Sequence, residues 1–420
     1  MRIIFHECKK AFTSPILVVL ILLFMAYNMF LIFSNSYFKE ELKVVNELAE
    51  TYGVKMTDES LHQFQQDLQK DFAKLNEITR KHTAQEFSSI DEFLNTLRYE
   101  DRDLYTEKEW AFFTQYQLKE MYFNLAKSID SEYDRMDWKR MAKSEIEMYG
   151  LSGSAAKILQ NEYDKFSQRF EEMKENREHK TWFFAGKPYK VHSFLFRTVF
   201  GHLIFEALIL IVLATALITN YEFENRTNLV TYSTKRGRRL MKDKLAASLL
   251  MATAITAFLF VITLGTYFSV FDYSYLWESS ISSALNWEYN LPYVSWWNLS
   301  FLAFLLLSIL LVYMCMILFS AITFVISIFV KNSYFTFFLF TAFFAMAYMM
   351  NGFMPQSSML IFIAGFNLSL LVMNPHMFFM GSGGLMMFKF YEMITVGVWM
   401  MIVSVLCIFS FKKFNKQEIY

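Results

Sequence analysis

The segment Asn220–Lys244, with the sequence NYEFENRTNLVTYSTKRGRRLMKDK, is a short basic loop between two apolar runs that are each long enough to cross a bilayer. It contains seven basic residues against three acidic ones, Glu222, Glu224 and Asp243. Short loops rich in Lys and Arg stay on the cytoplasmic side of a membrane. The sequence therefore predicts an all-α polytopic membrane protein in which this loop, 220–244, faces the cytoplasm.

Outward from the loop, the chain divides into polar and apolar parts. Residues 35–192 are strongly charged, whereas nearly all the rest is apolar, and the net charge of the 420 residues is zero. This balance gives no field that would attract nucleic acid. We expect an N-terminal elbow and first span in 1–34, a large extracytoplasmic domain in 35–192, and the remaining spans in 193–420.

Six apolar runs have the length of about 20 residues that a membrane helix needs. They are Ile16–Phe33, Ser193–Thr219, Leu245–Val270, Leu299–Val330, Ser333–Met350 and Phe390–Phe411. The first run is too long for the apolar part of a signal peptide and no small-residue cleavage site follows it, so we expect it to remain as an anchor. Basic residues flank the first span and end the last one, which places both termini in the cytoplasm of a multi-pass plasma-membrane protein.

The segment 351–388 is ambiguous. Its apolar run, 357–373, is broken by Gly365 and Asn367 and flanked by two prolines. A full crossing here would place the basic C-terminal end outside, against the positive-inside rule. We therefore predict a re-entrant or outer-leaflet helical hairpin before the last span, because irregular backbone is tolerated at depth where protein buries it. Whether 357–373 crosses fully stays open.

The polar segment 35–192 has apolar residues at helical spacing. One stripe steps by four and three: Leu159, Tyr163, Phe166, Phe170 and Met173. Such stripes indicate amphipathic helices that pack on one another, and we expect four to six of them. The three cysteines lie elsewhere, so no disulfide framework supports this domain. Aromatic residues in the later outer loop 271–298, such as Trp287 and Trp296, are typical of a membrane headgroup belt.

Signatures of enzymes and cofactor sites are lacking in the sequence. It contains no P-loop, no zinc-spaced Cys/His cluster and no nucleophile elbow, so we expect no catalytic residue, cofactor or metal in this chain. Gly381–Gly384 is interpreted as a turn. His202 and Glu206 are four residues apart on one helix face and are candidate pathway residues. The alternative is that they face a neighbouring helix or the polar domain.

The basic loop allows a more specific hypothesis. A transporter driven by a separate ATPase needs a cytoplasmic element that transmits force, and a short helix along the membrane would serve. Glu222 and Glu224 suit its first turn. Leu229, Val230 and Tyr232 supply an apolar contact, and the basic run would meet acidic groups of the motor or lipid headgroups. The alternative is an ordinary positive-inside loop.

This order of elements resembles the permeases of type-2 ATP-binding-cassette (ABC) exporters. Their loop between the second and third spans carries an acidic residue, Gly-Thr, a Ser/Pro-Lys/Arg stretch and a Lys before the next helix. The matching positions are Glu222, Glu224, Thr227, Ser233, Lys235, Arg236 and Lys244, while Arg226 replaces the glycine. The resemblance covers the membrane part alone.

The resemblance implies a dimer of permeases bound to ABC ATPase subunits, which would hold ATP–Mg. The contact to the ATPase would use Glu222, Glu224, Thr227, Leu229, Lys235, Arg236, Arg238 and Arg239. The pathway would lie between the permeases, lined by the second and fifth spans, for an amphipathic cargo such as a peptide, antibiotic or lipid. Two other classes stay open: a non-transporting sensor whose outer domain binds a ligand or partner, and a polytopic membrane enzyme.

Overall fold

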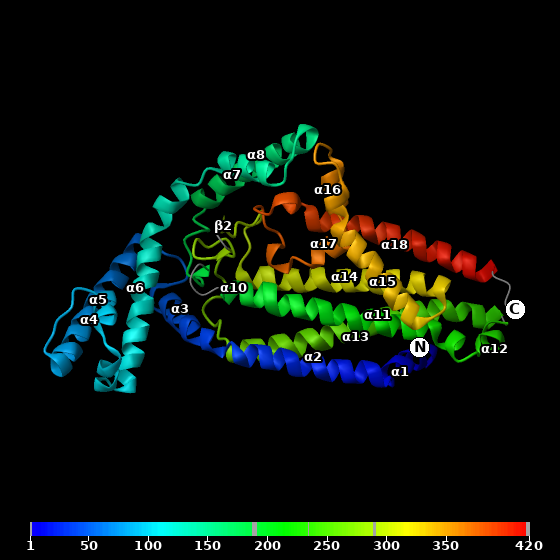
Figure 1. The fold of residues 1–420 in the computed structure, drawn as a ribbon, viewed down its shortest axis with the longest axis horizontal. Coiled ribbons are helices and arrows are strands. Elements are labelled where there is room, and N and C mark those ends of the chain that lie inside the picture. The colour runs from blue at the N-terminus through cyan, green and yellow to red at the C-terminus, as the bar shows by residue number, and fades with distance from the viewer. Residues whose placement is uncertain (1, 187–190, 234, 289–290, 417–420) are drawn as a thin grey trace.

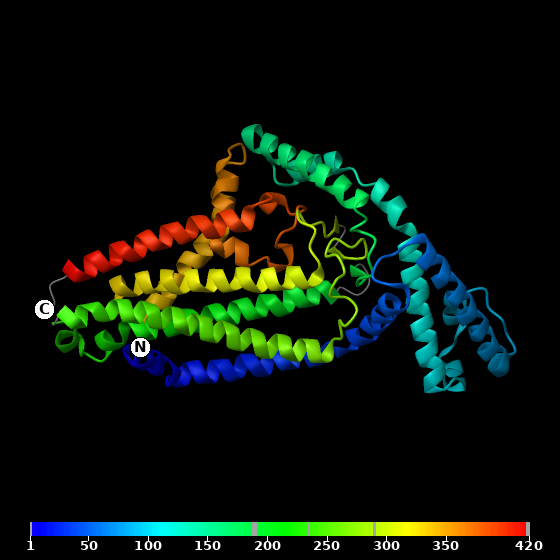
Figure 2. The ribbon, with the colours of Figure 1, turned by 180° about the vertical axis from the view of Figure 1, so that it is seen from behind.

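The computed structural model describes residues 2–186, 191–233, 235–288 and 291–416, and these ranges are predominantly helical (Figures 1 and 2). Their only strands are β1 (Trp287–Glu288) and β2 (Leu291–Pro292), which pair antiparallel. The all-α prediction is confirmed at this level.

Six helices of the described ranges are long and apolar enough to cross a membrane, as the sequence predicts. Four of them are single helices: α2 (Pro15–Ser34), α13 (Lys235–Val270), α14 (Phe301–Val330) and α18 (Tyr391–Lys416). The second span is the continuous run of α10 (Val191–Ser193), η3 (Phe194–Val199) and α11 (Phe200–Glu224). The fifth is α15 (Ser333–Met349) extended by η4 (Met350–Phe353). Local signals set their ends: Pro15 opens α2, Ser300 and Asn332 cap α14 and α15, and Lys331 ends α14 in a left-handed conformation.

Helix α11 forms the centre of the bundle. In its most apolar window 67% of the residues are buried, against 17% in α2 and in α15. Helices α13, α14 and α15 pack on it, and α18 packs on α14. Large apolar side chains such as Phe338 of α15 and Val405 of α18 are exposed on the outer helices, as expected where lipid replaces water.

The two ends of the bundle carry different structures (Figures 1 and 2). One end, which we call the loop end, holds α1 (Arg2–Phe12), α12 (Asn228–Tyr232) and the C-terminal end of α18. The opposite end, which we call the domain end, holds the helices that follow α2. The basic loop and both ends of the described chain therefore lie on the same side of the bundle.

The domain end contains a helical domain at 35–186. Its helices are α3 (Lys39–Tyr52), α4 (Asp58–Thr83), α5 (Ile90–Thr96), α6 (Glu107–Asp134), α7 (Trp138–Met148) and α8 (Gly153–Glu175), with the 3₁₀ turns η1 (Ser36–Phe38) and η2 (Tyr99–Leu104). Thr57 and Thr106 form capping boxes at the starts of α4 and α6. The stripe that begins at Leu159 is buried. Residues 187–190 of the predicted domain 35–192 lie outside the described ranges.

The segment 351–388 folds into short pieces. These are α16 (Leu360–Gly365), α17 (Leu368–Val372), η5 (Pro375–Met377) and η6 (Gly384–Met386). A six-residue helix is about 9 Å long, far short of a hydrocarbon core of about 30 Å. The bend between α16 and α17 falls at the predicted Gly365–Asn367 break, where the Asn367 side chain accepts from the Leu370 N–H at 2.8 Å.

Candidate functional site

The carboxylate of Glu222, in the last turn of α11, is the centre of a buried ionic cluster at the loop end. Its Oε1 atom accepts a hydrogen bond from Lys10 Nζ of α1 at 2.8 Å. Its Oε2 atom is bound by Lys244 Nζ of α13 and by the Tyr232 hydroxyl of α12 at 3.1 Å. With Glu7, whose Oε1 lies 2.7 Å from Lys10 Nζ, these residues form what we call the ionic cluster. It joins four helices: α11, α12 and α13 are consecutive in the chain, whereas Lys10 of α1 is 212 residues away from Glu222.

Lys244 is the most enclosed member of the ionic cluster, with no exposed surface. Besides Glu222, its ammonium group donates to the carbonyl oxygens of Ile218 at 2.6 Å and Thr219 at 3.0 Å. A lysine is favourable at the C-terminal end of a helix, where carbonyl dipoles point outward. Buried charges persist in proteins when they are paired and hydrogen-bonded, as here.

Lys10 lies outside the membrane-spanning helices, at the edge of the ionic cluster. Burial alone would lower the pKa of Lys10, but the carboxylates of Glu222 and Glu7 outweigh burial and raise it. The side chain therefore stays charged at neutral pH. Its ammonium group also lies 4.4 Å from the centre of the Tyr221 ring, a second interaction that holds α1 against α11.

Helix α12 rests on this cluster and presents an apolar tip. Tyr232 is buried, stacks on Phe223 at 5.5 Å and meets Phe414 of α18 edge-on at 5.2 Å. On the other side of the helix, Leu229 is 49% exposed and Val230 is 81% exposed. A five-residue helix is unstable alone, so these contacts define where the exposed pair is held.

Arg226 occupies a position that favours glycine. Its φ is +56°, in the left-handed region, where the chain leaves α11 and turns toward α12. The Thr227 N–H donates to the Glu222 carbonyl at 2.9 Å across this turn. A glycine would suit this conformation better than the arginine found here.

The prediction that Glu222 and Glu224 begin the loop helix is wrong. Helix α11 continues for five residues beyond the apolar run, so both carboxylates lie in its last turn. Glu222 is buried, while the exposed Glu224 accepts from the Ser333 N–H at 2.6 Å at the start of α15. Thr227 is exposed in the connecting turn.

The basic run lies on a helix instead of in a loop. Helix α13 begins at Lys235, so the run occupies its first turns, and Arg239 is exposed there. The side chains of Lys235, Arg236 and Arg238 lie outside the described residues. Their contact with a motor stays a prediction.

His202 and Glu206 both face α2. Glu206 is buried and accepts from Asn28 Nδ2 at 2.7 Å, and the same amide group lies 3.2 Å from Thr263 Oγ1 of α13. The Nε2 atom of His202 lies 3.4 Å from the Tyr27 hydroxyl oxygen. This is the arrangement of the alternative interpretation, in which the pair faces a neighbouring helix. A pathway role for either residue stays a prediction.

At the domain end, residues 271–288 and 291–300 form what we call the outer platform, which joins the helical domain to the bundle. Segment 178–186 runs between the platform and Val54–Met56: the Trp182 N–H donates to the Val54 carbonyl, and the Ala284 N–H to the His179 carbonyl, both at 2.9 Å. Asn46 of α3 donates to the Asp272 carbonyl at 2.7 Å. The domain is thus tied to the platform through its backbone.

A buried ion pair strengthens this junction. Arg169 of α8 binds Glu178 with both ends of its guanidinium group, at 3.0 and 2.5 Å, and donates from Nε to the Ser295 carbonyl at 3.2 Å. Both side chains are buried. Bidentate pairs of this kind fix geometry as well as charge.

The aromatic residues predicted to form a headgroup belt are buried in the platform instead. Trp287, Tyr293 and Trp296 are each less than a tenth exposed. Trp296 Nε1 donates to the Met387 carbonyl at 2.8 Å, which ties the platform to segment 374–388. The belt prediction is wrong for these residues because the helical domain covers the loop, which sequence spacing alone does not reveal.

Gly381 and Gly384 are needed where the helical domain touches segment 374–388. A Cβ atom at 381 would lie 2.1 Å from the Phe166 ring of α8. A Cβ atom at 384, where φ is +58°, would lie 2.8 Å from the Tyr149 hydroxyl oxygen. The segment has a bend at Gly381 and begins the 3₁₀ helix η6 at Gly384, and both glycines accommodate aromatic side chains of the domain.

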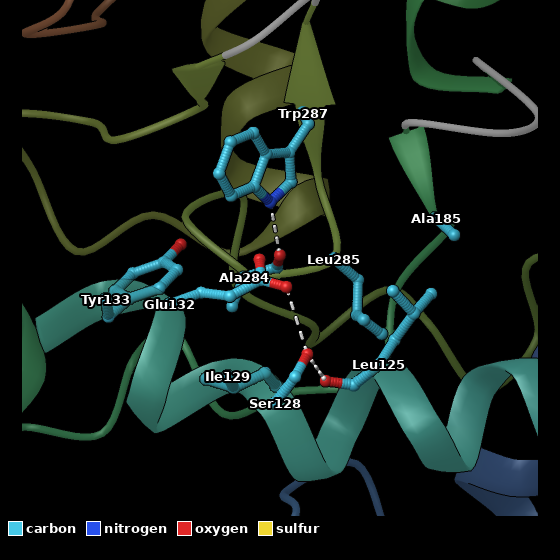
Figure 3. Close-up of a pocket in the computed structure, with 9 residues that line it drawn as sticks. All are labelled: Leu125, Ser128, Ile129, Glu132, Tyr133, Ala185, Ala284, Leu285 and Trp287. Carbon is cyan, nitrogen blue, oxygen red and sulfur yellow. Dashed lines mark hydrogen bonds between the residues drawn. The ribbon is translucent and has the colours of Figure 1, made fainter. Parts of the chain in front are cut away.

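Several cavities lie at the domain end, including two beside the platform residues Trp287 and Tyr293. The smaller one, between α6 and the platform beside Trp287, has a volume of about 20 Å³, enough for a single water molecule (Figure 3). The larger one is a cleft of about 360 Å³ lined by residues that include Glu145, Tyr149 and His376. Its volume lies in the range of small-molecule sites, as do those of two other clefts, of about 420 Å³ beside Glu120 and about 490 Å³ beside Asp272.

Sequence reasoning missed the roles of Glu7, Lys10 and Lys244. Glu7 is the only acidic residue in the basic elbow that precedes the first span, and this isolated charge was the available signal.

Across the described residues, no group of three or more His, Cys, Asp or Glu side chains is placed to hold a metal ion. Comparisons of the chain with protein-family models, with curated proteins and with solved structures found no match.

Proposed function

We propose that this chain is the membrane-spanning subunit of a transporter driven by a separate ATPase, and that α12 is its contact with that ATPase. The observation that supports this most directly is the exposed pair Leu229–Val230, held on a helix whose other face is fixed by the ionic cluster. Exposed apolar side chains on a fixed element, next to a basic segment, are typical of a docking surface.

The ionic cluster gives this proposal a mechanical basis. Tyr232 and Lys244 connect α12 and α13 to the end of α11 through Glu222, and Lys10 connects α1 to the same carboxylate. A displacement of α12 is therefore passed to α11, the most buried helix of the bundle. The ATPase would bind ATP–Mg and supply the force, and this chain would hold no cofactor.

In this proposal the loop end faces the cytoplasm and the helical domain lies outside the cell, with 351–388 as a re-entrant or outer-leaflet hairpin. A second permease would complete the assembly, with a pathway between the two copies along α11 and α15. The cargo would be amphipathic, and His202 and Glu206 would be pathway residues. Basic residues at the loop end support this orientation.

Cysteine labelling tests the orientation. The native Cys8, Cys315 and Cys407 are all buried, so an introduced cysteine would react selectively. Val230→Cys should react with an impermeant maleimide only after the membrane is opened, and Met148→Cys, 67% exposed at the domain end, should react in intact cells. The reverse pattern would overturn the proposal.

Copurification tests the partner. The chain should bring down a nucleotide-hydrolysing protein from its native membrane in a mild non-ionic detergent. Replacing Lys235, Arg236, Arg238 and Arg239 by Glu should abolish this association while the protein still inserts. A native complex without an ATPase would contradict the assignment.

A sensor is the second candidate, and the cleft of about 360 Å³ favours it. Its lining joins the helical domain to segment 374–388, so an occupied cleft would restrain the domain against the bundle. A purified complex that contains no ATPase but still binds a ligand in this cleft would favour the sensor.

A further inference from the structure

The cleft at the domain end is formed by three parts of the chain. Helix α7 contributes Glu145 and the residue after its end, Tyr149, the platform contributes Tyr293, and segment 374–388 contributes His376 and Ser382. These parts lie side by side where the helical domain meets the bundle (Figures 1 and 2). A volume of about 360 Å³ lies at the lower end of the range for small-molecule sites.

Glu145 supplies the charge of this cleft. Among the described lining residues it is the only Asp, Glu, Lys or Arg. Its Oε2 atom is buried, and neither this atom nor the Tyr163 hydroxyl makes a hydrogen bond of good geometry. The Tyr163 hydroxyl is still close enough to affect the pKa of Glu145. Burial raises the pKa of Glu145, an effect that the Tyr163 hydroxyl partly offsets. The described lining includes no Lys or Arg to pair with Glu145, so a cationic ligand would supply the opposite charge at this half-buried carboxylate.

Aromatic rings form the walls. Tyr149 lies over the backbone at Gly384, which has no Cβ atom to push the ring away. Tyr293 is buried and meets His192 edge-on at a ring distance of 4.6 Å, so its position is fixed. Faces of tyrosine rings attract ammonium groups, most strongly where water is excluded.

We propose that this cleft binds a small organic cation, a primary or quaternary ammonium group with a short apolar or hydroxylated substituent. The ammonium group would lie against the Glu145 carboxylate between the rings of Tyr149 and Tyr293. An anionic ligand would be repelled by Glu145, and an alkyl chain would leave the carboxylate unpaired. The same chemistry occurs in soluble amines and in choline-type lipid headgroups.

The test uses the purified full chain in a non-ionic detergent, with choline as the probe and its uncharged isostere 3,3-dimethylbutan-1-ol as the comparison. Isothermal titration calorimetry should detect choline binding and at least tenfold weaker binding of the isostere. Glu145→Gln keeps the size of the side chain and should weaken choline binding at least tenfold. Glu147→Gln, an exposed position on the same helix outside the cleft, should leave it unchanged.

A second variant guards against loss of folding. Tyr149→Leu should weaken choline binding about two- to thirtyfold, the range expected for a lost cation–π contact of about 0.5–2 kcal/mol. Both cleft variants should keep the thermal unfolding midpoint of the native protein. Equal binding of choline and its isostere, or unchanged binding in a folded Glu145→Gln variant, would overturn the proposal.

Competition identifies the source of the cation. Dihexanoylphosphatidylcholine below its micelle concentration carries the same ammonium group on a lipid headgroup. Displacement of bound choline by this lipid would assign the cleft to headgroups. Choline binding that the lipid does not disturb would assign it to a soluble amine. The binding measurement needs no ATPase, so its outcome is independent of the proposed transport function.

Discussion

The loop end and the domain end of the bundle are held together in different ways. At the loop end, a few charged side chains around Glu222 join four helices. At the domain end, the outer platform is joined to the helical domain by backbone hydrogen bonds, packed aromatic rings and the Arg169–Glu178 pair. The first arrangement concentrates its stability in one group, and the second distributes it. A single substitution should therefore matter most at the loop end.

The largest effect is expected from Lys244→Met. The substitution leaves the Glu222 carboxylate buried without its closest cation, and breaking a buried ion pair in this way costs about 3–5 kcal/mol. We expect a correspondingly lower free energy of unfolding, measured by denaturation in detergent. The matched control, Lys242→Met, changes an exposed lysine two residues away and should have little effect.

A double variant shows whether the lower free energy of unfolding of Lys244→Met comes from the unpaired Glu222 charge. Glu222→Gln combined with Lys244→Met removes both charges and should recover most of the stability, because apolar replacement of a buried pair is often nearly neutral. A double variant as unstable as the single one would show that Lys244 acts by packing instead of by charge.

Gly381→Ala should have the next largest effect and should test the domain end. The new Cβ atom would lie 2.1 Å from the buried Phe166 ring, so the helical domain must shift away from segment 374–388. Overpacking of this kind typically costs about 1–3 kcal/mol. Gly397→Ala, where a Cβ atom would meet nothing within 4 Å, is the control.

Phe166→Leu should relieve part of this cost in the Gly381→Ala background, because the smaller side chain leaves room for the methyl group. Thermal unfolding of the native protein, the two single variants and the double variant measures the coupling energy between positions 166 and 381. Strictly additive effects would mean that the two residues do not touch as described.

Glu41, near the junction of the helical domain with the outer platform, should make the stability of the protein depend on pH. It is buried in α3 and accepts a hydrogen bond from the Tyr122 hydroxyl, which itself accepts from the Ala185 N–H at 3.0 Å. Burial raises the pKa of Glu41 from 4.5 to about 8, against the opposing hydrogen bonds. The folded protein then binds more protons than the unfolded chain between these values, so stability is full below pH 4.5 and falls as pH rises to about 8.

Glu41→Gln should flatten this slope, because the amide stays neutral and still accepts from Tyr122. Unfolding free energies measured from pH 4.5 to 8 would show it. Glu40→Gln, at the exposed neighbouring position, should keep the native slope. A native slope in Glu41→Gln would exclude Glu41 as its origin.

The same contrast explains what the sequence could predict. The six spans and the helices of 35–186 follow from hydropathy and helical spacing, which are local properties. The ionic cluster joins Glu7 to Glu222 and Lys244 across more than 200 residues, and no local pattern encodes such a pairing. Burial of Trp296 depends in the same way on a domain more than a hundred residues earlier in the chain.

The smallest effect on stability, and the most informative for function, is expected from Leu229→Ser combined with Val230→Ser. Both side chains are exposed on α12, and surface substitutions usually change stability by no more than about 0.5 kcal/mol. If α12 docks on an ATPase, the variant should unfold like the native protein yet lose the ATPase on purification. Phe5→Ser, at a 72% exposed apolar position of α1 at the same end, should retain it. Loss in both variants would mean that any exposed apolar group at the loop end supports the association, and α12 would then have no special role in transmitting force through the ionic cluster.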